Sequence, residues 1–358
     1  MLLPETDPPA SVLVDIIDGV GVLTLNRPAV LNALDLATVR ALTRQLDAWS
    51  DDPAIRAVLL RGSGERAFCA GGDVRALYHL QREGAPALVC YFDEEYALDC
   101  LIHRYPKPTI ALMDGVVMGG GMGISQGCAH RLVTERTRMA MPETAIGIFP
   151  DVGASYFLSR LPPALGAWIG VVGDTLSGAD AVVSGLADRL VPSAFFTDLP
   201  ALIAAVDAGA WPAAPTHTSI PSQLTAPVLA AVARHFGQPG VEEILASLAG
   251  ETDPALRTWV ERTQGLLAQR SPLMLRVTFE QLRRGRQLDL EACFRMERTM
   301  MAHSFAHGDA MEGIRALLID KDRSPRWRHR AVAEVWRDEV EAFFDPGAPQ
   351  KPPRATRA

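Results

Sequence analysis

Apolar residues in the first third of the chain follow two different spacings in turn. Two runs rich in Val, Ile and Leu, VLVDII at 12–17 and GVGVLTLN at 19–26, predict strands. Residues 36–49 then carry apolar side chains three and four positions apart, which predicts a helix with Asp35 as its N-cap. IRAVLLRG at 55–62 predicts the next strand. This order of strands and helix is typical of an α/β fold.

The same alternation continues further along the chain. Residues 108–113 (PTIALM) predict a strand, 119–127 a glycine-dense helix start, and 131–134 and 138–141 two short strands. Each strand-strand-helix unit must bury one face against the next, so the pattern predicts a coil of such units. From Asp151 onward the apolar spacing predicts helices over 153–160, 164–172, 179–184, 241–248, 254–269, 272–284 and 290–304.

A stretch without Asp, Glu, Lys or Arg separates the two parts of the chain. Residues 208–227 contain four prolines among Ser, Thr and Gln residues, which is typical of a linker and not of a membrane span. We therefore expect a flexible N-terminus at 1–11, an α/β core at 12–207, this linker at 208–227, a helical C-terminal region at 228–344 and a disordered tail at 345–358.

The composition and charge of the chain exclude several classes of protein. Of the 358 residues, 48% are apolar and 22% are charged, as in ordinary soluble globular proteins. The net charge of -7 argues against nucleic acid or anionic membrane as a partner. The five cysteines form no CxxC pair, so we expect neither a disulfide framework nor a zinc site. Acidic Glu5 and Asp7, with no basic residue before Arg27, argue against a targeting segment, so we expect a cytoplasmic location.

Two glycine-rich segments could bring backbone N–H groups close to a ligand. FCAGGD at 68–73 follows a predicted strand and precedes a helix, which is also what a plain turn would require. The second segment has five glycines between 115 and 123, a density that destabilises a helix start unless an oxyanion or phosphate binds there. A dinucleotide-binding loop is disfavoured because the spacing is not GxGxxG.

A third segment, MPETAIGIFPDVG at 141–153, places Glu143 and Asp151 in apolar surroundings. Both carboxyl groups are expected to face one cavity, where partial desolvation raises the pKa and suits a general acid, base or nucleophile. Helix capping is the alternative, since Asp151 precedes a predicted helix and Glu143 could lie in a first helical turn. No Ser, His and Asp set follows the pattern of a serine hydrolase.

Taken together, these motifs resemble those of a known superfamily. NRP at 26–28, NAL at 32–34, FCAGGD at 68–73 and GGGMG at 119–123 resemble the crotonase superfamily of enoyl-CoA hydratases and isomerases. AMPETAIGIFPDVGASYFLSRL at 140–161 and IRALLIDKDRSPRW at 314–327 resemble its 3-hydroxyisobutyryl-CoA hydrolase branch. The resemblance implies a crotonase-like spiral of strand-strand-helix repeats with a helical C-terminal region, and a thioester hydrolase of valine catabolism.

The resemblance also implies roles for individual residues. Gly72 and Gly120 would donate the two backbone N–H groups of an oxyanion hole, and Glu143 and Asp151 would be the catalytic carboxyl groups. Glu95 would line the acyl pocket, so that Glu95, Gly120, Glu143 and Asp151 contact the substrate. Coenzyme A would be part of the acyl-CoA substrate, with no separate cofactor and no metal, and the protein could form a homo-oligomer.

Position 123 separates the branches of the superfamily. Similar hydratases carry a glutamate there, whereas this chain has Gly123, so the pair of glutamates that adds water to an enoyl group is missing. Thioester hydrolysis is therefore favoured over an enoyl-CoA hydratase or isomerase acting on another acyl-CoA. A non-catalytic acyl-CoA binding protein is the third hypothesis, disfavoured because a binder gains nothing from buried unpaired carboxyl groups.

One departure from the resemblance concerns DAMEG at 309–313. The relatives tend to have Asp-Phe-x-Glu-Gly before the IDKD motif, and this chain has Ala310 where they have Phe. We therefore expect different packing around the acyl chain. The route of catalysis also stays open at this point, since Glu143 could attack the carbonyl carbon or activate water.

Overall fold

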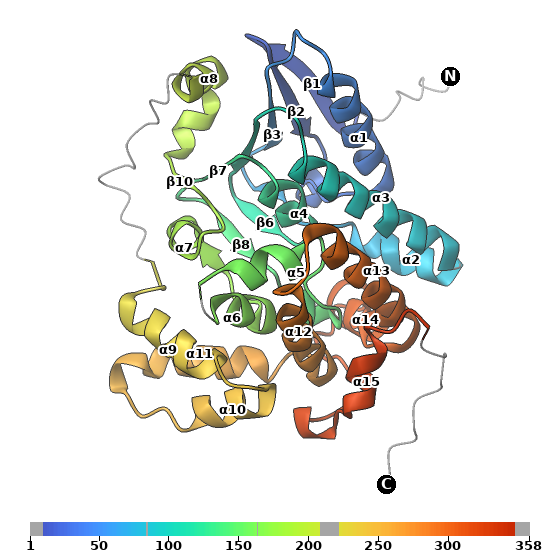
Figure 1. Cartoon of the computed structure of the whole chain (residues 1–358), viewed down its shortest axis with the longest axis vertical. Helices are drawn as coiled ribbons and strands as arrows, with labels where there is room; N and C mark the ends of the chain where they lie inside the picture. The colour runs from blue at the N-terminus through green and yellow to red at the C-terminus, as the bar shows by residue number, and fades with distance from the viewer. Residues whose placement is uncertain (1–9, 84, 163, 208–221, 348–358) are drawn as a thin grey trace, which may run out of the picture.

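The computed structural model of the chain describes residues 10–83, 85–162, 164–207 and 222–347, and its strands form two sheets (Figure 1). The first has the order β1 (Val12–Ile17), β2 (Val20–Leu25), β3 (Ala57–Gly62), β5 (Thr109–Met113), β7 (His130–Val133), β10 (Arg189–Leu190). The second has the order β4 (Ala67–Cys69), β6 (Val116–Met118), β8 (Arg138–Ala140), β9 (Leu176–Ser177). Pairing is parallel except between β1 and β2 and between β8 and β9.

Successive turns of the chain each add one strand to each sheet. β3 and β4 are followed by α2 (Val74–Glu83) and α3 (Ala85–His103), and β5 and β6 by α4 (Gly120–Gln126). β7 and β8 are followed by the short 3-10 helix η2 (Glu143–Ile146). The predicted coil of strand-strand-helix units is therefore confirmed, and the turns after β4, β6 and β8 come to lie next to one another.

The helix α1 (Leu36–Ser50) shows how the local pattern produces this packing. Asp35 accepts a hydrogen bond from the Thr38 N–H at 2.8 Å, as the predicted N-cap should. The buried residues of α1, spaced three and four apart, end with Trp49, whose ring lies against Gly21 of β2. A Cβ atom at Gly21 would lie 2.4 Å from that ring, so only glycine fits there.

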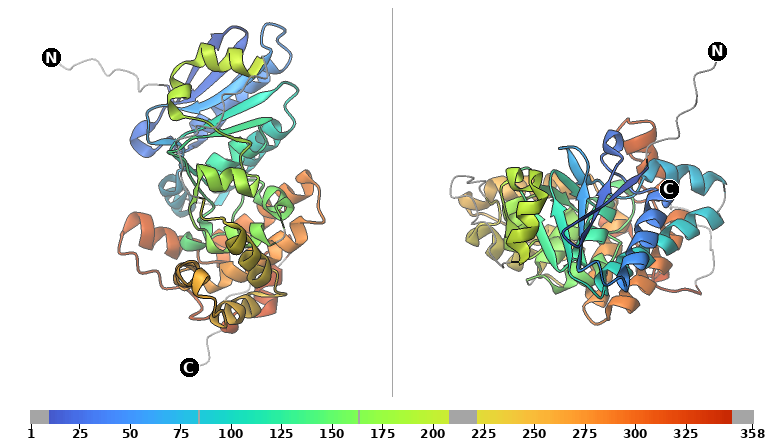
Figure 2. Two further views of the ribbon diagram at one scale, coloured as in Figure 1. Left: turned by 90° about the vertical axis from the view of Figure 1, so that its left-hand side faces the viewer. Right: turned by 90° about the horizontal axis from the view of Figure 1, so that it is seen from above.

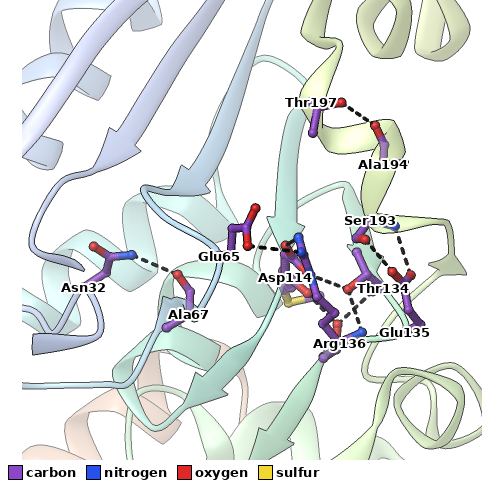
Figure 3. Close-up of polar contacts among 12 residues, drawn as sticks. Asn32, Glu65, Ala67, Asp114, Thr134, Glu135, Arg136, Ser193, Ala194 and Thr197 are labelled. Carbon is purple, nitrogen blue, oxygen red and sulfur yellow. Dashed lines mark hydrogen bonds and ion pairs between the residues drawn. The ribbon is translucent and has the colours of Figure 1, made fainter. Parts of the chain in front are cut away.

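Polar side chains hold the corners of the spiral together (Figure 3). The Asn32 side chain donates to the Ala67 carbonyl at 2.8 Å, which fixes the turn into β4. Asp114, between β5 and β6, accepts a hydrogen bond from Thr134 at 2.6 Å and pairs with Arg136, both in the turn between β7 and β8. These contacts join turns that are distant in the sequence.

Helices dominate after η2, and the C-terminal ones lie at the opposite end of the molecule from the six-stranded sheet (Figures 1 and 2). The α-helices of this part are α5 (Ala154–Phe157), α6 (Leu165–Val172), α7 (Gly178–Ser184), α8 (Leu199–Asp207), α9 (Ala226–Phe236), α10 (Val241–Ala249), α11 (Arg257–Leu267), α12 (Pro272–Gly285), α13 (Leu290–His307), α14 (Ala310–Ile314) and α15 (Arg337–Ala342). Shorter turns are η1 (Pro28–Val30), η3 (Leu158–Arg160), η4 (Ser193–Thr197), η5 (Pro254–Leu256), the π-helical η6 (Arg315–Ile319) and η7 (Val332–Glu334). No helix of the described ranges is both long and apolar enough to cross a membrane.

The predicted boundaries need one correction at the linker. α9 begins at Ala226, so the linker predicted at 208–227 reaches two residues too far. Pro227 occupies the first turn of α9, where its missing N–H costs no helical hydrogen bond. Residues 208–221 of that linker, 1–9 of the predicted flexible N-terminus and 348–358 of the predicted disordered tail lie outside the described residues.

Candidate active site

A cavity of about 140 Å³ lies where α3 and the turns after β4, β6 and β8 meet α13 and α14. All five residues singled out in the sequence line it: Gly72, Glu95, Gly120, Glu143 and Asp151. The remaining lining is mostly apolar and includes Leu77, Phe92, Ile146, Ile148, Val152, Phe305, Ile314 and Leu317. The last three come from the helical C-terminal region, so both parts of the chain build the cavity.

Gly72 and Gly120 present neighbouring backbone N–H groups at one end of this cavity. A Cβ atom on Gly120 would lie 3.3 Å from the Gly72 nitrogen, and one on Gly71 would lie 3.3 Å from the Gly120 nitrogen. Gly71 has a φ of +98°, a conformation that favours glycine. Within the described part of the chain, neither N–H donates a hydrogen bond. Two free donors this close together can hold a carbonyl oxygen as it becomes negative.

Glu95 projects from α3 toward these donors. Its Oε1 atom would lie 2.7 Å from a Cβ atom on Gly120, so a side chain at position 120 would collide with it. The same Oε1 lies 3.1 Å from the Tyr91 hydroxyl, which also lies 3.0 Å from the Leu34 carbonyl oxygen. Glu95 is therefore next to the bound oxygen expected at Gly72 and Gly120, as well as on the wall of the cavity.

Glu143 begins η2 and is buried, with its Oε2 atom lacking a hydrogen-bond partner among the described residues. The turn that carries it is held by the helical C-terminal region, because the Ser271 N–H donates to the Thr144 carbonyl at 3.1 Å. Gly147 ends η2 at a φ of +75°, where a Cβ atom would lie 2.3 Å from the Asp309 carbonyl oxygen. Glu143 thus has a fixed backbone and a free carboxyl oxygen.

The structure corrects the capping interpretation of Asp151. The N-cap of α5 is Gly153, and the Asp151 side chain makes no capping hydrogen bond. Instead its Oδ2 atom accepts a hydrogen bond from the Tyr96 hydroxyl at 2.8 Å. The acidic residue that does bind the start of α5 is Glu297 of α13, which accepts from the Gly153 and Ser155 N–H groups, both at 2.8 Å.

Several residues that shape this site were not predicted from the sequence. Asp99 and Glu297 are fully buried, and Tyr91 and Tyr96 nearly so. The Gln281 side chain of α12 holds the Pro150 carbonyl at 2.5 Å, just before Asp151. For the residues of α3 a signal existed, because 91, 92, 95, 96 and 99 fall on one helical face. Glu297 and Gln281 carried the same signal, because each falls on the face of its helix that holds the apolar residues.

Five buried carboxyl groups gather here without a basic partner among the described residues: Glu95, Asp99, Glu143, Asp151 and Glu297. Burial is the largest cause of their altered acidity, and the neighbouring negative charges add to it for several of them. The pKa of Asp151 is raised to about 6, and those of Glu95 and Glu297 to about 8. The pKa values of Glu143 and Asp99 lie well above their usual range. Near neutral pH, Asp151 is therefore the ionised member.

Gly123 of α4 lies beneath the cavity floor, where there is no room for a side chain. A Cβ atom there would lie 2.7 Å from the Cβ of Val152 and 2.8 and 2.9 Å from the two carboxyl oxygens of Asp99. Asp99 makes no hydrogen bond through either oxygen within the described residues. The space that a larger residue at 123 would need is thus already filled from α3 and from the loop after η2.

A second hollow, of about 380 Å³, lies at α9 and α10 and contains His235. The His235 ring lies 2.7 Å from the Ser247 hydroxyl and 3.0 Å from a Glu251 carboxyl oxygen, which superficially suits nucleophilic catalysis. Ser247 is near the C-terminal end of α10, however, and the N–H groups of residues 250–253 that follow all donate within the chain. Without a free donor for an oxyanion, the trio serves to join two helices.

Comparison with known proteins adds to this geometry. A family model described as enoyl-CoA hydratase/isomerase matches residues 20–344. The chain is 38% identical to 3-hydroxyisobutyryl-CoA hydrolase 1 of Arabidopsis thaliana, over 94% of this chain and 92% of the relative. It is 37% identical to the mitochondrial 3-hydroxyisobutyryl-CoA hydrolase of Gallus gallus, over 96% and 90%.

Solved structures with the same architecture carry other names. A crystal structure titled as an enoyl-CoA hydratase from Rhodobacter sphaeroides has a TM-score of 0.85 and 38% identity, and covers 95% of this chain and 98% of its own. One titled as a carnitinyl-CoA dehydratase from Mycobacterium thermoresistibile has a TM-score of 0.84 and 40% identity, with 95% and 97% covered. The predicted spiral with its helical C-terminal region is therefore confirmed, and the reaction has to be argued from the site.

Proposed function

Because the chain belongs to the enoyl-CoA hydratase/isomerase family, we propose that it hydrolyses an acyl-CoA thioester, with 3-hydroxyisobutyryl-CoA as the substrate. The products would be 3-hydroxyisobutyrate and free coenzyme A, as in the valine catabolism that the sequence resemblance implies. Hydrolases of that name, at 36–38% identity over most of the chain, support this choice.

The filled space at Gly123 is the observation that carries the proposal. Adding water to an enoyl group requires two carboxyl groups that act together on neighbouring carbons. The proximity of Val152 and Asp99 leaves no place for a second glutamate on α4, while Glu143 and Asp151 remain in the cavity. Cleavage of a thioester requires attack on the carbonyl carbon alone. Glu143 and Asp151 can together provide the nucleophile and the proton transfers for that attack.

Catalysis would begin with the thioester oxygen between the Gly72 and Gly120 N–H groups. These donors stabilise the negative charge that forms on the oxygen when the carbonyl carbon is attacked. Both are free within the described residues, so binding the oxygen breaks no existing hydrogen bond. Loss of one such donor typically lowers the rate by about 100- to 1000-fold.

Glu143 and Asp151 would divide the proton transfers between them. Glu143 is protonated in the free site and Asp151 is ionised, so Asp151 is the base that accepts the first proton. That proton comes from Glu143 if its carboxylate attacks the carbon, or from water if water attacks directly. In both routes the carbon–sulfur bond breaks and the departing thiolate takes up a proton from a carboxyl group. In the first route a water molecule then cleaves the acyl–Glu143 anhydride.

Two substrates distinguish the proposal from the hydratase alternative. Purified protein should release free thiol from 3-hydroxyisobutyryl-CoA, followed with a thiol reagent, and should leave the enoyl absorbance of crotonyl-CoA unchanged. Loss of that absorbance without release of thiol would instead assign the hydratase reaction suggested by the names of the solved structures. Binding of both compounds without turnover would indicate a non-catalytic protein.

We also propose that no cofactor or metal is needed besides the coenzyme A of the substrate, because every step above uses amide and carboxyl groups of the chain. Activity that survives dialysis against a chelator would support this. The cytoplasmic location and the homo-oligomer stay predictions, and several of the relatives are named mitochondrial.

A further inference from the structure

Two tyrosines of α3 contact two different carboxyl groups of the cavity. The Tyr96 hydroxyl donates to Asp151 Oδ2 at 2.8 Å. The Tyr91 hydroxyl lies 3.0 Å from the Leu34 carbonyl oxygen and 3.1 Å from Glu95 Oε1. All of these side chains are buried. Each hydroxyl has a single proton to donate, so the direction of its hydrogen bond determines which carboxyl group can keep a charge.

The two hydroxyls differ in the number of acceptors that each one faces. The Tyr91 hydroxyl faces two acceptors, Glu95 Oε1 and the Leu34 carbonyl oxygen, which also accepts from the Asp73 N–H, so its single proton is divided between them. Tyr96 has no other acceptor among the described residues, so its proton goes to Asp151, and a carboxylate is the form that this bond stabilises. One helix thus presents a donor shared with a carbonyl oxygen to Glu95, and a donor with a single acceptor to Asp151.

We propose that Tyr96 is a positioning residue that keeps Asp151 ionised and thereby sets the pH range in which the site can act. This inference rests on the proposed function for its effect on rate. The effect of Tyr96 on the charge of Asp151 is independent of the proposed function, because it can be measured in the absence of substrate.

Among the described side chains around Asp151, none besides Tyr96 donates to its carboxyl group, and the other favourable contact is with the residue's own backbone N–H. Asp151 is faced by Glu95 and Asp99 from α3, by Glu143 from η2 and by Glu297 from α13. All four are carboxyl groups, and any charge on them disfavours a charge on Asp151. Gln281 of α12 is neutral and donates to the Pro150 carbonyl. Within the described residues, the Tyr96 hydroxyl is therefore the side-chain donor that offsets the burial of Asp151.

The proposal predicts the sign of a shift. Tyr96→Phe keeps the ring that packs against Phe92 and Phe294 and removes only the hydroxyl. Without the donor, the pKa of Asp151 should rise from about 6 by about one pH unit, a tenfold increase in its affinity for a proton. At pH 6 the hydrolysis rate should then fall several-fold, while well above pH 8 it should approach that of the unmodified protein.

The test combines the pH dependence of hydrolysis with infrared titration of the protonated carboxyl band, which is assigned to Asp151 by its loss in Asp151→Asn. Tyr96→Phe should move the acid limb of the rate and the infrared midpoint upward together. Tyr105→Phe is the matched control, because it removes a tyrosine hydroxyl too. The Tyr105 hydroxyl donates to the Leu46 backbone carbonyl, away from the cavity. Tyr105→Phe should move neither quantity.

A fluorinated tyrosine at position 96 gives a second measurement if Tyr96→Phe is unstable. Fluorine makes the hydroxyl a stronger donor, so both midpoints should move downward. Midpoints that stay fixed in both variants would overturn the proposal, and so would an infrared shift without any shift of the acid limb. An infrared shift in a protein that hydrolyses no thioester would instead disprove the proposed function and leave the role of Tyr96 in the charge of Asp151 intact.

Discussion

Glu143 combines burial with a carboxyl oxygen that has no partner among the described residues, and this combination makes its acidity responsive to substrate. A carboxyl group that is already bound by donors would lose those bonds when it reacts. Glu143 has none to lose at Oε2, and its backbone is fixed by Ser271 and Gly147. To react with the carbonyl carbon, Glu143 therefore has only to transfer one proton to Asp151.

Glu143→Gln tests this at the scale of one residue. The amide has nearly the same shape but can neither attack a carbonyl carbon nor accept a proton, so we expect hydrolysis to fall about 100- to 10,000-fold. The melting temperature should not fall, because the substitution removes an acid whose pKa is already raised by burial. Steady-state release of thiol and a thermal melt measure the two effects. Turnover close to that of the unmodified protein would contradict the assignment of Glu143.

Asp151→Asn separates chemistry from structure at the second carboxyl group. Asn can still accept the Tyr96 hydrogen bond, and no helix cap is lost because Gly153 is the N-cap of α5. We therefore expect a nearly unchanged melting temperature and a turnover lowered by roughly 100-fold. Both should be measured on one preparation, and a variant that is both stable and active would return Asp151 to a structural role.

Contacts between elements, and not the properties of α4 itself, restrict position 123. Three consecutive glycines, 119–121, form the N-cap and first residues of α4, and a Cβ atom at 121 would lie 2.3 Å from the Cys69 carbonyl oxygen. At 123 the obstacles are Val152 and Asp99, from two other elements. The helix can therefore approach β4 and α3 closely only because positions 121 and 123 carry no side chain.

Gly123→Glu is the corresponding experiment. The new side chain collides with Val152 and places a carboxyl group against Asp99, so we expect a loss of about 2 kcal/mol or more in the free energy of unfolding and no efficient hydration of crotonyl-CoA. Chemical denaturation and the enoyl absorbance measure these. Gly265→Glu on α11 is the control, since nothing lies within 4 Å of a Cβ atom there. Fast hydration by the Gly123 variant would show that the second carboxyl position is open after all.

For the whole molecule, the buried carboxyl groups relate stability to pH. Glu95 and Glu297 keep their protons in the folded protein up to a pKa of about 8, far above the ordinary glutamate range. Between pH 6.5 and 8 the folded state therefore binds more protons than the unfolded state, and stability falls as pH rises. The half-buried His103 and His303, with pKa values lowered to about 4 by desolvation, change stability in the opposite direction, but only below pH 6.5.

We therefore expect the free energy of unfolding to decrease from pH 6.5 to pH 8, at up to about 1.4 kcal/mol per pH unit for each carboxyl group that keeps its proton. Denaturant titrations at three pH values across this window would measure it. Glu297→Gln should reduce the slope, because one of these groups is removed. A free energy that is constant or rises across the window would show that the cluster is charged in the folded protein.

The sequence by itself determined the features that depend on neighbours along the chain. The order of strands and helices, the Asp35 cap and the two glycine turns follow from local spacing and from the conformations that glycine permits. Glu143 and Asp151 were identified for the same reason, because their apolar neighbours 146, 148 and 152 surround them along the chain as well as in the cavity.

Only the tertiary structure decided how those two carboxyl groups behave. Tyr96 reaches Asp151, Glu297 binds the turn after it, and Asp99 fills the space beside Gly123 across large separations in the chain. No local pattern encodes such contacts, since each pair is brought together by the coiling of the spiral and the packing of α13 against it. Burial and neighbouring charge set the proton affinity of a carboxyl group, and both exist only once the chain has folded.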